Sequence, residues 1–214
     1  PNVKDKKVSV CISVNNMTEH EGKAKLEVFA QSINADQNYI VAPESFETAI
    51  PKGNSQVEFD YNCGEEMLLW DEDNPNIYKL IVSLETNTGE MTYYDKKTQE
   101  FGMREFSTEG TQFTINNRKV FLRGTHDACV FPLTGYSPMD TEDWIRVFKI
   151  AKSYGLNHYR FHSWCPPKAA FKAADLMGIY LQPKLPNWAS FNEPDSKDYR
   201  KGHEEYLRKE GQRI

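Results

Sequence analysis

The chain has 214 residues, with 39% hydrophobic and 13% aromatic residues. This length suggests one or two domains, and the aromatic content argues against intrinsic disorder, because disordered segments have little apolar surface to bury. The 26 basic and 31 acidic residues are well mixed and give a net charge of −5, so we expect no nucleic-acid partner. No apolar run has the length of a membrane span, and we expect no membrane partner.

The first hundred residues have the pattern of short β-strands. Apolar and polar side chains alternate in four runs, at 8–14, 24–30, 57–61 and 78–84. A period of two buries one face of each strand, and several such runs separated by turn residues predict a β-sandwich. A hairpin follows, with Asn116-Asn117 as its turn.

After residue 120 the pattern changes to alternating strands and helices. Strands are expected at 121–125, 158–162 and 179–185, with one helix beginning at Asp140, one at Pro166-Pro167 and a polar helix at roughly 198–213. Strand–helix alternation with short links predicts parallel βαβ units. Three strands are too few to close a barrel, so the segment is either a small open sheet or part of a longer α/β domain.

Two groups of motifs resemble one enzyme family. The first group is LWDEDNPNIYKL at 69–80 and FGMR at 101–104; the second is FTINNRKVFLRG at 113–124, GLNHYR at 155–160 and DLMGIY at 175–180. In this order they resemble glycoside hydrolase family 2, the family of β-galactosidases, β-glucuronidases and β-mannosidases. In such a sandwich Trp70, beside Asn74-Pro75, is expected to pack in the core at a corner.

The resemblance implies an immunoglobulin-like β-sandwich at 1–104, followed at 105–214 by the first βα units of a (β/α)8 TIM barrel. In that family a jelly roll precedes the sandwich, and it would lie outside this chain together with the later barrel strands. The implied function is that of a retaining exo-glycosidase, hydrolysing a β-linked glycoside (β-galactosidase-like) in carbohydrate breakdown. An oligosaccharide or glycoside is the implied substrate, and no cofactor is expected. The compartment stays open, with a periplasmic or secreted location favoured for a glycan-degrading enzyme.

Candidate site residues lie where the barrel strands end, since barrel chemistry gathers at the carboxyl ends of the strands. The substrate-binding candidates are His126, Asp127, Arg160, His162, Trp164, Asn187 and Trp188. The family has an arginine at the position of Arg160, near the floor of its site. It usually has asparagine near His126, and often Ser-His-Tyr-Pro where this chain has His162-Ser163-Trp164-Cys165-Pro166, so the sugar stays open.

Two other patterns carry less weight. Asn192-Glu193 matches the family's acid/base signature, but no apolar strand leads into it, so we expect a loop and a helix cap. The two catalytic glutamates would lie beyond residue 214, and the chain alone is expected to be inactive. The two His-x-x-Cys motifs beginning at His126 and His162 have zinc-ligand types, but nothing in the sequence makes them converge, and no metal is expected.

Two alternatives remain on the sequence alone. One is a carbohydrate-binding or adhesion module in which the sandwich is the working part, and the other is a complete small α/β protein. If the barrel is incomplete, its third strand at 179–185 has an unpaired edge. We then expect either a homodimer through that edge or weaker order in the segment than in the sandwich.

Overall fold

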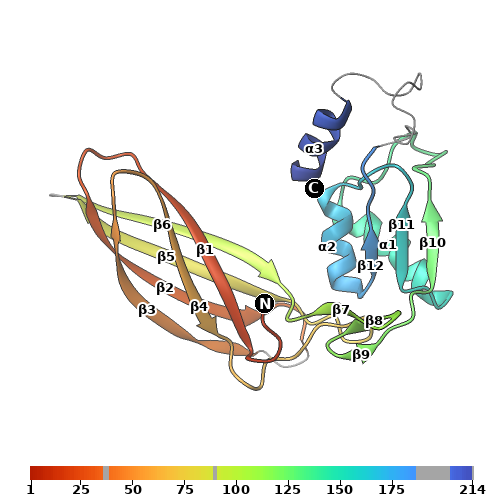
Figure 1. Cartoon of the computed structure of the whole chain (residues 1–214), viewed down its shortest axis with the longest axis horizontal. Coiled ribbons are helices and arrows are strands. Elements are labelled where there is room, and N and C mark those ends of the chain that lie inside the picture. The colour runs from red at the N-terminus through yellow and green to blue at the C-terminus, as the bar shows by residue number, and fades with distance from the viewer. Residues whose placement is uncertain (36–38, 89–90, 187–202, 214) are drawn as a thin grey trace. The chain divides into compact units, whose positions relative to one another are not determined.

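The computed structural model describes residues 1–35, 39–88, 91–186 and 203–213 (Figure 1). The chain forms two compact units, 1–120 and 121–214. Their division lies beyond the sequence-based boundary at 104/105, because the short sheet at 106–119 is bonded to the sandwich corner through Asn116 and Arg118. None of the described helices has the length and apolarity needed to cross a membrane.

The first unit contains two antiparallel sheets built from six long strands. Their bounds are Lys7–Asn16 (β1), Gly22–Ser32 (β2), Ile40–Ile50 (β3), Gly53–Asn62 (β4), Tyr78–Thr88 (β5) and Met91–Phe101 (β6). One sheet has the order β3-β2-β5-β6, and the other consists of β1 and β4. The pair β1–β4 lies across the larger sheet (Figure 1).

The core of this unit lies between the two sheets. Alternate residues of β2, from Ala24 to Ala30, are buried, and they share one apolar cluster with Val8 of β1 and with Val57 and Tyr61 of β4. Because one face of each sheet contributes to one core, the expected β-sandwich is confirmed. The four alternating runs of the sequence correspond to β1, β2, β4 and β5.

The strands β3 and β6 were not expected, and both lie at edges of the four-stranded sheet. The residues of β6 are exposed from Met91 to Gln99, and β3 contains Pro43. An edge strand buries little surface and tolerates proline, so neither strand has the apolar alternation by which the others are identified.

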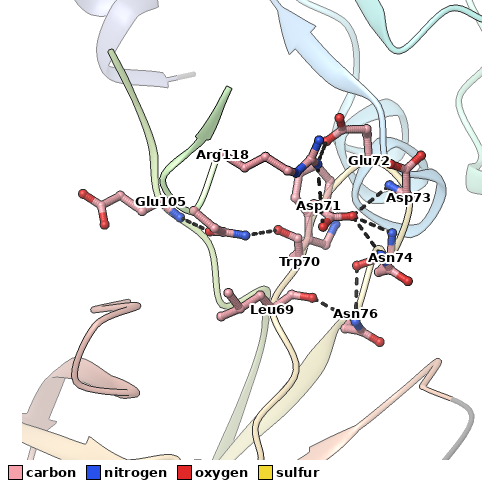
Figure 2. Close-up of polar contacts among 10 residues, drawn as sticks. Leu69, Trp70, Asp71, Glu72, Asp73, Asn74, Asn76, Glu105 and Arg118 are labelled. Atoms are coloured by element: carbon pink, nitrogen blue, oxygen red, sulfur yellow. Dashed lines mark hydrogen bonds and ion pairs between the residues drawn. The ribbon is translucent and has the colours of Figure 1, made fainter. Parts of the chain in front are cut away.

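The corner at residues 69–76 connects the sandwich to the following hairpin (Figure 2). Trp70 is fully buried, as expected, and the Arg104 guanidinium lies 4.4 Å from the centre of its ring. The Trp70 N–H donates to Met103 O at 2.9 Å. Asp71 Oδ1 accepts from the N–H groups of Asp73 and Asn74, which closes the turn through a single carboxylate.

A small sheet follows, made of Phe106–Glu109 (β7), Gln112–Ile115 (β8) and Arg118–Lys119 (β9). Asn116 and Asn117, the expected hairpin turn, have φ angles of 50° and 63°. Two left-handed residues in a two-residue loop are typical of a type I′ turn, which matches the twist of the flanking strands. The Arg118 guanidinium contacts Glu72 at 3.1 Å and so joins this hairpin to the corner.

The second unit is an alternating α/β segment. Its elements are Gly124–Asp127 (β10), Thr141–Ser153 (α1), His158–Phe161 (β11), Lys168–Met177 (α2), Tyr180–Gln182 (β12) and His203–Arg213 (α3). The strands form a parallel sheet in the order β10-β11-β12, which confirms the expected parallel βαβ units. The helix α1 begins after Asp140, whose carboxylate accepts from Asp143 N, and α2 ends at Gly178 in the left-handed conformation.

The first of these strands begins later than expected, at Gly124 instead of residue 121. The buried side chain of Asn157 explains the difference. Its Oδ1 accepts from Arg123 N at 2.8 Å, and its Nδ2 donates to Phe121 O at 3.1 Å. The backbone before the strand is therefore bonded to this side chain. The third strand is also shorter than expected, ending at Gln182.

The core of the second unit is formed by residues of α1, α2 and β11. Trp144 and Phe148 of α1 and Phe161 of β11 are fully buried, together with Ala170 and Ala173 of α2. The ring of Trp144 contacts Phe148 at 5.4 Å and Phe161 at 6.0 Å between centroids. The small residues of α2 allow that helix to pack closely against the aromatic side chains of α1 and β11. Residues of α1, α2 and the sheet therefore share one core.

Candidate substrate-binding site

Five of the seven candidate residues lie at or just after the carboxyl ends of β10 and β11. His126 and Asp127 are the last residues of β10, and His126 is paired in register with Arg160 of β11. Because neighbouring parallel strands end at the same edge of a sheet, the parallel register brings these side chains together. His162 and Trp164 follow β11 directly.

Backbone and side-chain bonds to Asp127 hold the segment after β11 in place. The His162 N–H donates to Asp127 O at 2.7 Å, which extends the parallel ladder by one bond. The indole Nε1 of Trp164 donates to the same carbonyl oxygen at 3.3 Å. The rings of His126 and His162 lie 4.8 Å apart between centroids, at 56° to one another. Four candidates therefore form one cluster.

The Asp127 carboxylate is oriented by the backbone of the next turn. Its Oδ1 accepts from Cys129 N at 2.7 Å, and Cys129 has a left-handed φ of 60°. Burial raises the pKa of Asp127, while the bond from Cys129 and the neighbouring His126 act against the rise. The carboxylate is thus a positioned hydrogen-bond acceptor beside an exposed imidazole.

Burial and neighbouring charges both act on the pKa of His162. Partial burial lowers its pKa, and His126, Lys184 and Arg160 lower it further through charge repulsion. A histidine with a lowered pKa stays neutral near pH 7, so its ring can both donate and accept a hydrogen bond. Arg160 also lowers the pKa of His158, after the larger effect of burial. The charge of Arg160 thus disfavours the protonated form of both imidazoles.

Trp164 has a packing role as well as a place in the cluster. Its ring contacts Phe131 at 6.2 Å and Phe161 at 5.1 Å, edge to face in both cases. It is half-buried against the core of the second unit. Only part of the indole is therefore open to a ligand.

Lys184 is a neighbour of the cluster that the sequence analysis did not identify. Its backbone N–H donates to Trp164 O at 3.1 Å, and its charge acts on His162. The available signal was its position, two residues after the end of β12. Asn187, Trp188 and the pair Asn192-Glu193 lie outside the described residues.

The polar groups at these strand ends can donate and accept hydrogen bonds. They offer a carboxylate, imidazoles and a guanidinium, which bind hydroxyl groups, and part of an indole ring. Within the ranges that the structure describes, no three His, Cys, Asp or Glu side chains converge as metal ligands do. No acid and base carboxyl pair is formed among the described candidates, of which Asp127 is the single carboxylate.

Comparison with known proteins gives one consistent result. Residues 1–104 match the family model of the glycosyl hydrolases family 2. A β-galactosidase of Thermoanaerobacterium thermosulfurigenes is 25% identical over 186 residues, covering 86% of this chain and 25% of that protein. A putative β-glucuronidase of Formosa agariphila is 25% identical over 175 residues, covering 82% of this chain and 20% of that protein.

Solved structures show the same fold. A β-glucuronidase of Bacteroides uniformis superposes with a TM-score of 0.73 at 17% identity, covering 93% of this chain and 23% of that one. A family 2 glycosyl hydrolase from Bacteroides cellulosilyticus gives a TM-score of 0.65 at 21% identity, covering 84% of this chain and 24% of that one. The chain thus spans 20–25% of the length of these four proteins.

Proposed function

The chain belongs to glycosyl hydrolase family 2, and on this premise we propose that it is a segment of a retaining exo-glycosidase acting on a β-linked sugar. Relatives named β-galactosidase and β-glucuronidase support a β-glycosidase as the parent protein. Residues 1–104 would be its immunoglobulin-like domain, the part that the family model matches.

In this proposal residues 105–214 contain the beginning of the catalytic (β/α)8 barrel. The parallel order β10-β11-β12 with α1 and α2 between the strands supports it, because consecutive strands of such a barrel are neighbours. The three strands would be the first three of eight, and further polypeptide would close the barrel. The length of the relatives is consistent with this.

The cluster after β10 and β11 would bind the sugar. The observation that carries this assignment is the register of His126 with Arg160, combined with the bonds from His162 and Trp164 to Asp127. These contacts place five polar groups at the edge of the sheet where barrel enzymes bind their substrates. Asn187 and Trp188 would extend the same site after β12.

The cluster would position the substrate, and the catalytic step would use groups elsewhere in the parent. Retaining hydrolysis requires two carboxyl groups about 5–5.5 Å apart, one protonated and one ionised. We place both in the later part of the barrel. A neutral His162 would exchange hydrogen bonds with sugar hydroxyls, and the fixed charge of Arg160 would orient them.

The test is kinetic and uses the full parent enzyme with aryl β-galactosides and aryl β-glucuronides. Arg160→Lys should lower kcat/KM on the preferred substrate by about 100-fold, because small errors of positioning in an active site cost rate. Arg146→Lys is the matched control, since Arg146 is an exposed residue of α1 that pairs with Asp143. It should leave kcat/KM unchanged.

The 214-residue chain alone should release no aglycone above the buffer rate from either substrate. Turnover by this chain that is abolished by Glu193→Gln would contradict both its proposed inactivity and the placement of the catalytic pair. An Arg160→Lys enzyme with unchanged kcat/KM would remove the cluster from the substrate site.

A further inference from the structure

The sandwich of the first unit has a groove on the side where β1 and β6 form the edges of opposite sheets. Among the described strands, β1 forms a ladder with β4 and β6 forms one with β5. Two adjoining hollows, of ≈ 260 and ≈ 460 Å³, lie between β1 and β6 and are lined by both strands. Together they have the scale of a ligand site. We call this feature the sandwich groove.

One wall of the sandwich groove and part of its floor are apolar. The wall consists of Val10, Ile12 and Val14, alternate residues of β1 that pack against the core. Val82 and Leu84 of β5 contribute to the floor. A ligand in the groove therefore meets aliphatic side chains on this side.

The opposite wall is polar, although it belongs to the core-facing side of its sheet. The register of β5 with β6 shows this, because paired residues of neighbouring strands point to the same face. The core-facing residues of β5 pair with alternate residues of β6, namely Leu80 with Gln99, Val82 with Lys97, Leu84 with Asp95 and Thr86 with Tyr93. These four residues of β6 all line the groove.

Protection of the sheet edge explains only part of this row. Charged residues that point inward prevent an edge strand from pairing with other chains, which accounts for Asp95 and Lys97. It does not account for Tyr93, which is 40% exposed at the same wall. The row from Tyr93 to Gln99 extends over roughly 20 Å, since a strand rises about 3.3 Å per residue. It therefore offers hydrogen-bonding groups along a chain-like ligand.

The difference between the two walls indicates the kind of ligand. A pyranose ring has a face of apolar C–H groups and a rim of hydroxyl groups, each of which donates and accepts hydrogen bonds. The C–H face can pack on the aliphatic wall and on the ring of Tyr93, while the hydroxyl groups bond Asp95 and Lys97. An apolar protein segment in the same place would bury these two charges without partners, which is strongly unfavourable. Because the two charges cancel, this wall favours a neutral ligand.

We propose that the sandwich groove binds a neutral oligosaccharide, which would give the first unit a carbohydrate site of its own. The proposal rests on the proposed function only in taking glycans as the class of ligand. All the residues that carry it belong to the first unit. Such a site would keep the parent enzyme on a glycan between successive hydrolyses.

Nuclear magnetic resonance titration of the 214-residue chain tests the proposal. The neutral probes are β-1,4-linked tetrasaccharides of galactose, glucose and mannose, and tetragalacturonate is the acidic comparison. At least one neutral probe should shift the amide resonances of 92–99 and 10–14, with a Kd in the millimolar range or below. Tetragalacturonate should bind about ten-fold more weakly, because Asp95 repels it. Absence of binding by all three neutral probes, or tighter binding of the acidic one, would overturn the proposal.

Two consecutive tyrosines of β6 provide a matched pair of variants. Tyr93 pairs with Thr86 on the groove side, whereas Tyr94 pairs with Glu85 on the outer face and is 73% exposed. Tyr93→Ala should weaken binding of the neutral probe at least ten-fold, and Tyr94→Ala should leave it unchanged. Asp95→Asn keeps the size of the side chain and should also weaken binding. Equal effects of the two tyrosine variants would overturn the proposal.

The same spectra distinguish this site from the other possible occupants and sites. Shifts confined to the ends of β10 and β11 would overturn the sandwich groove as a site and support the cluster there. A chain that sediments as a dimer and binds no probe would show that a second copy fills the groove, which also overturns the proposal. Neither measurement uses hydrolysis. Failure here therefore leaves the glycosidase proposal intact, and failure of the Arg160→Lys test leaves the sandwich groove intact.

Discussion

Asn116 and Asn117 share a left-handed backbone, but only Asn116 joins the hairpin to the sandwich corner. Its Nδ2 donates to Trp70 O at 3.0 Å, and its Oδ1 accepts from Glu105 N at 2.9 Å. Asn116→Ala should lower the free energy of unfolding by about 2–3 kcal/mol, since two backbone groups lose their partner. Urea denaturation of the chain measures this.

Asn117→Ala is the control for that substitution. Asn117 has φ of 63° and an exposed side chain, so its replacement tests the cost of alanine in a left-handed turn alone. We expect this control to cost about 1 kcal/mol. Equal losses for the two variants would show that the Asn116 bonds contribute nothing beyond the turn conformation.

The cysteines differ in reactivity because they differ in burial. Cys63 is fully buried, and burial raises the pKa of its thiol to about 11, whereas Cys129 is exposed. The thiolate is the reactive form, so iodoacetamide at pH 8 should label Cys129 within minutes and Cys63 only when the sandwich opens.

Cys11, at an exposed position on the outer face of β1, should be labelled together with Cys129. Peptide mass spectrometry after labelling distinguishes the sites. Under denaturing, non-reducing conditions all four thiols should react, as the free cysteines of the structure imply. Fast native labelling of Cys63 would mean that the sandwich core is open to solvent.

At the scale of elements, the sequence identifies those that bury one face. The alternating runs at 8–14 and 24–30 are found in β1 and β2, and the helix cap at Asp140 is found as expected. The edge strands β3 and β6 were missed because β6 is exposed on both faces from Met91 to Gln99, and β3 buries only Val41 and Ile50 near its ends, so neither has a continuous apolar period. Local pattern thus predicts buried elements well and edges poorly.

The candidate site shows the same limit. Strand ends predict which residues meet, and four of the seven candidates form one cluster, with Arg160 in register beside it. The carbonyl of Asp127, which accepts from both His162 and Trp164, has no sequence signal because every residue has such a group. Lys184 was missed because its approach depends on where β12 ends.

Asn157 sets the start of the parallel sheet, so its removal should act on the whole second unit. It is 3% exposed, and its side chain bonds the backbone of Phe121 and Arg123. Asn157→Ala should destabilise this unit by about 2–3 kcal/mol, because two part-buried backbone groups lose their partner. Hydrogen exchange of the β11 amides reports on it. Gln182→Ala, which removes an amide from an exposed position of β12, should leave these rates unchanged.

At the scale of the whole molecule, the two units differ in how completely they are packed. The first has a core drawn from both of its sheets. In the second, β12 pairs only with β11 among the described strands, and we propose that the rest of the barrel covers its other edge in the parent. An edge strand of a parallel sheet that is left uncovered either pairs with another copy of the chain or becomes less ordered.

Limited proteolysis with trypsin distinguishes the two units. Cleavage should begin after Lys119, an exposed residue at the end of β9 and close to the boundary at 120/121, because Asn116 and Arg118 bind the hairpin before it to the corner. The product should be a resistant fragment of about residues 1–119, with the second unit degraded faster, or protected only at concentrations where sedimentation shows a homodimer. A monomer that resists trypsin across 121–186 would mean that the α/β segment is a finished fold. The proposal of a partial barrel would then be wrong, because the α/β segment would be stable without the remaining strands of an eight-stranded barrel.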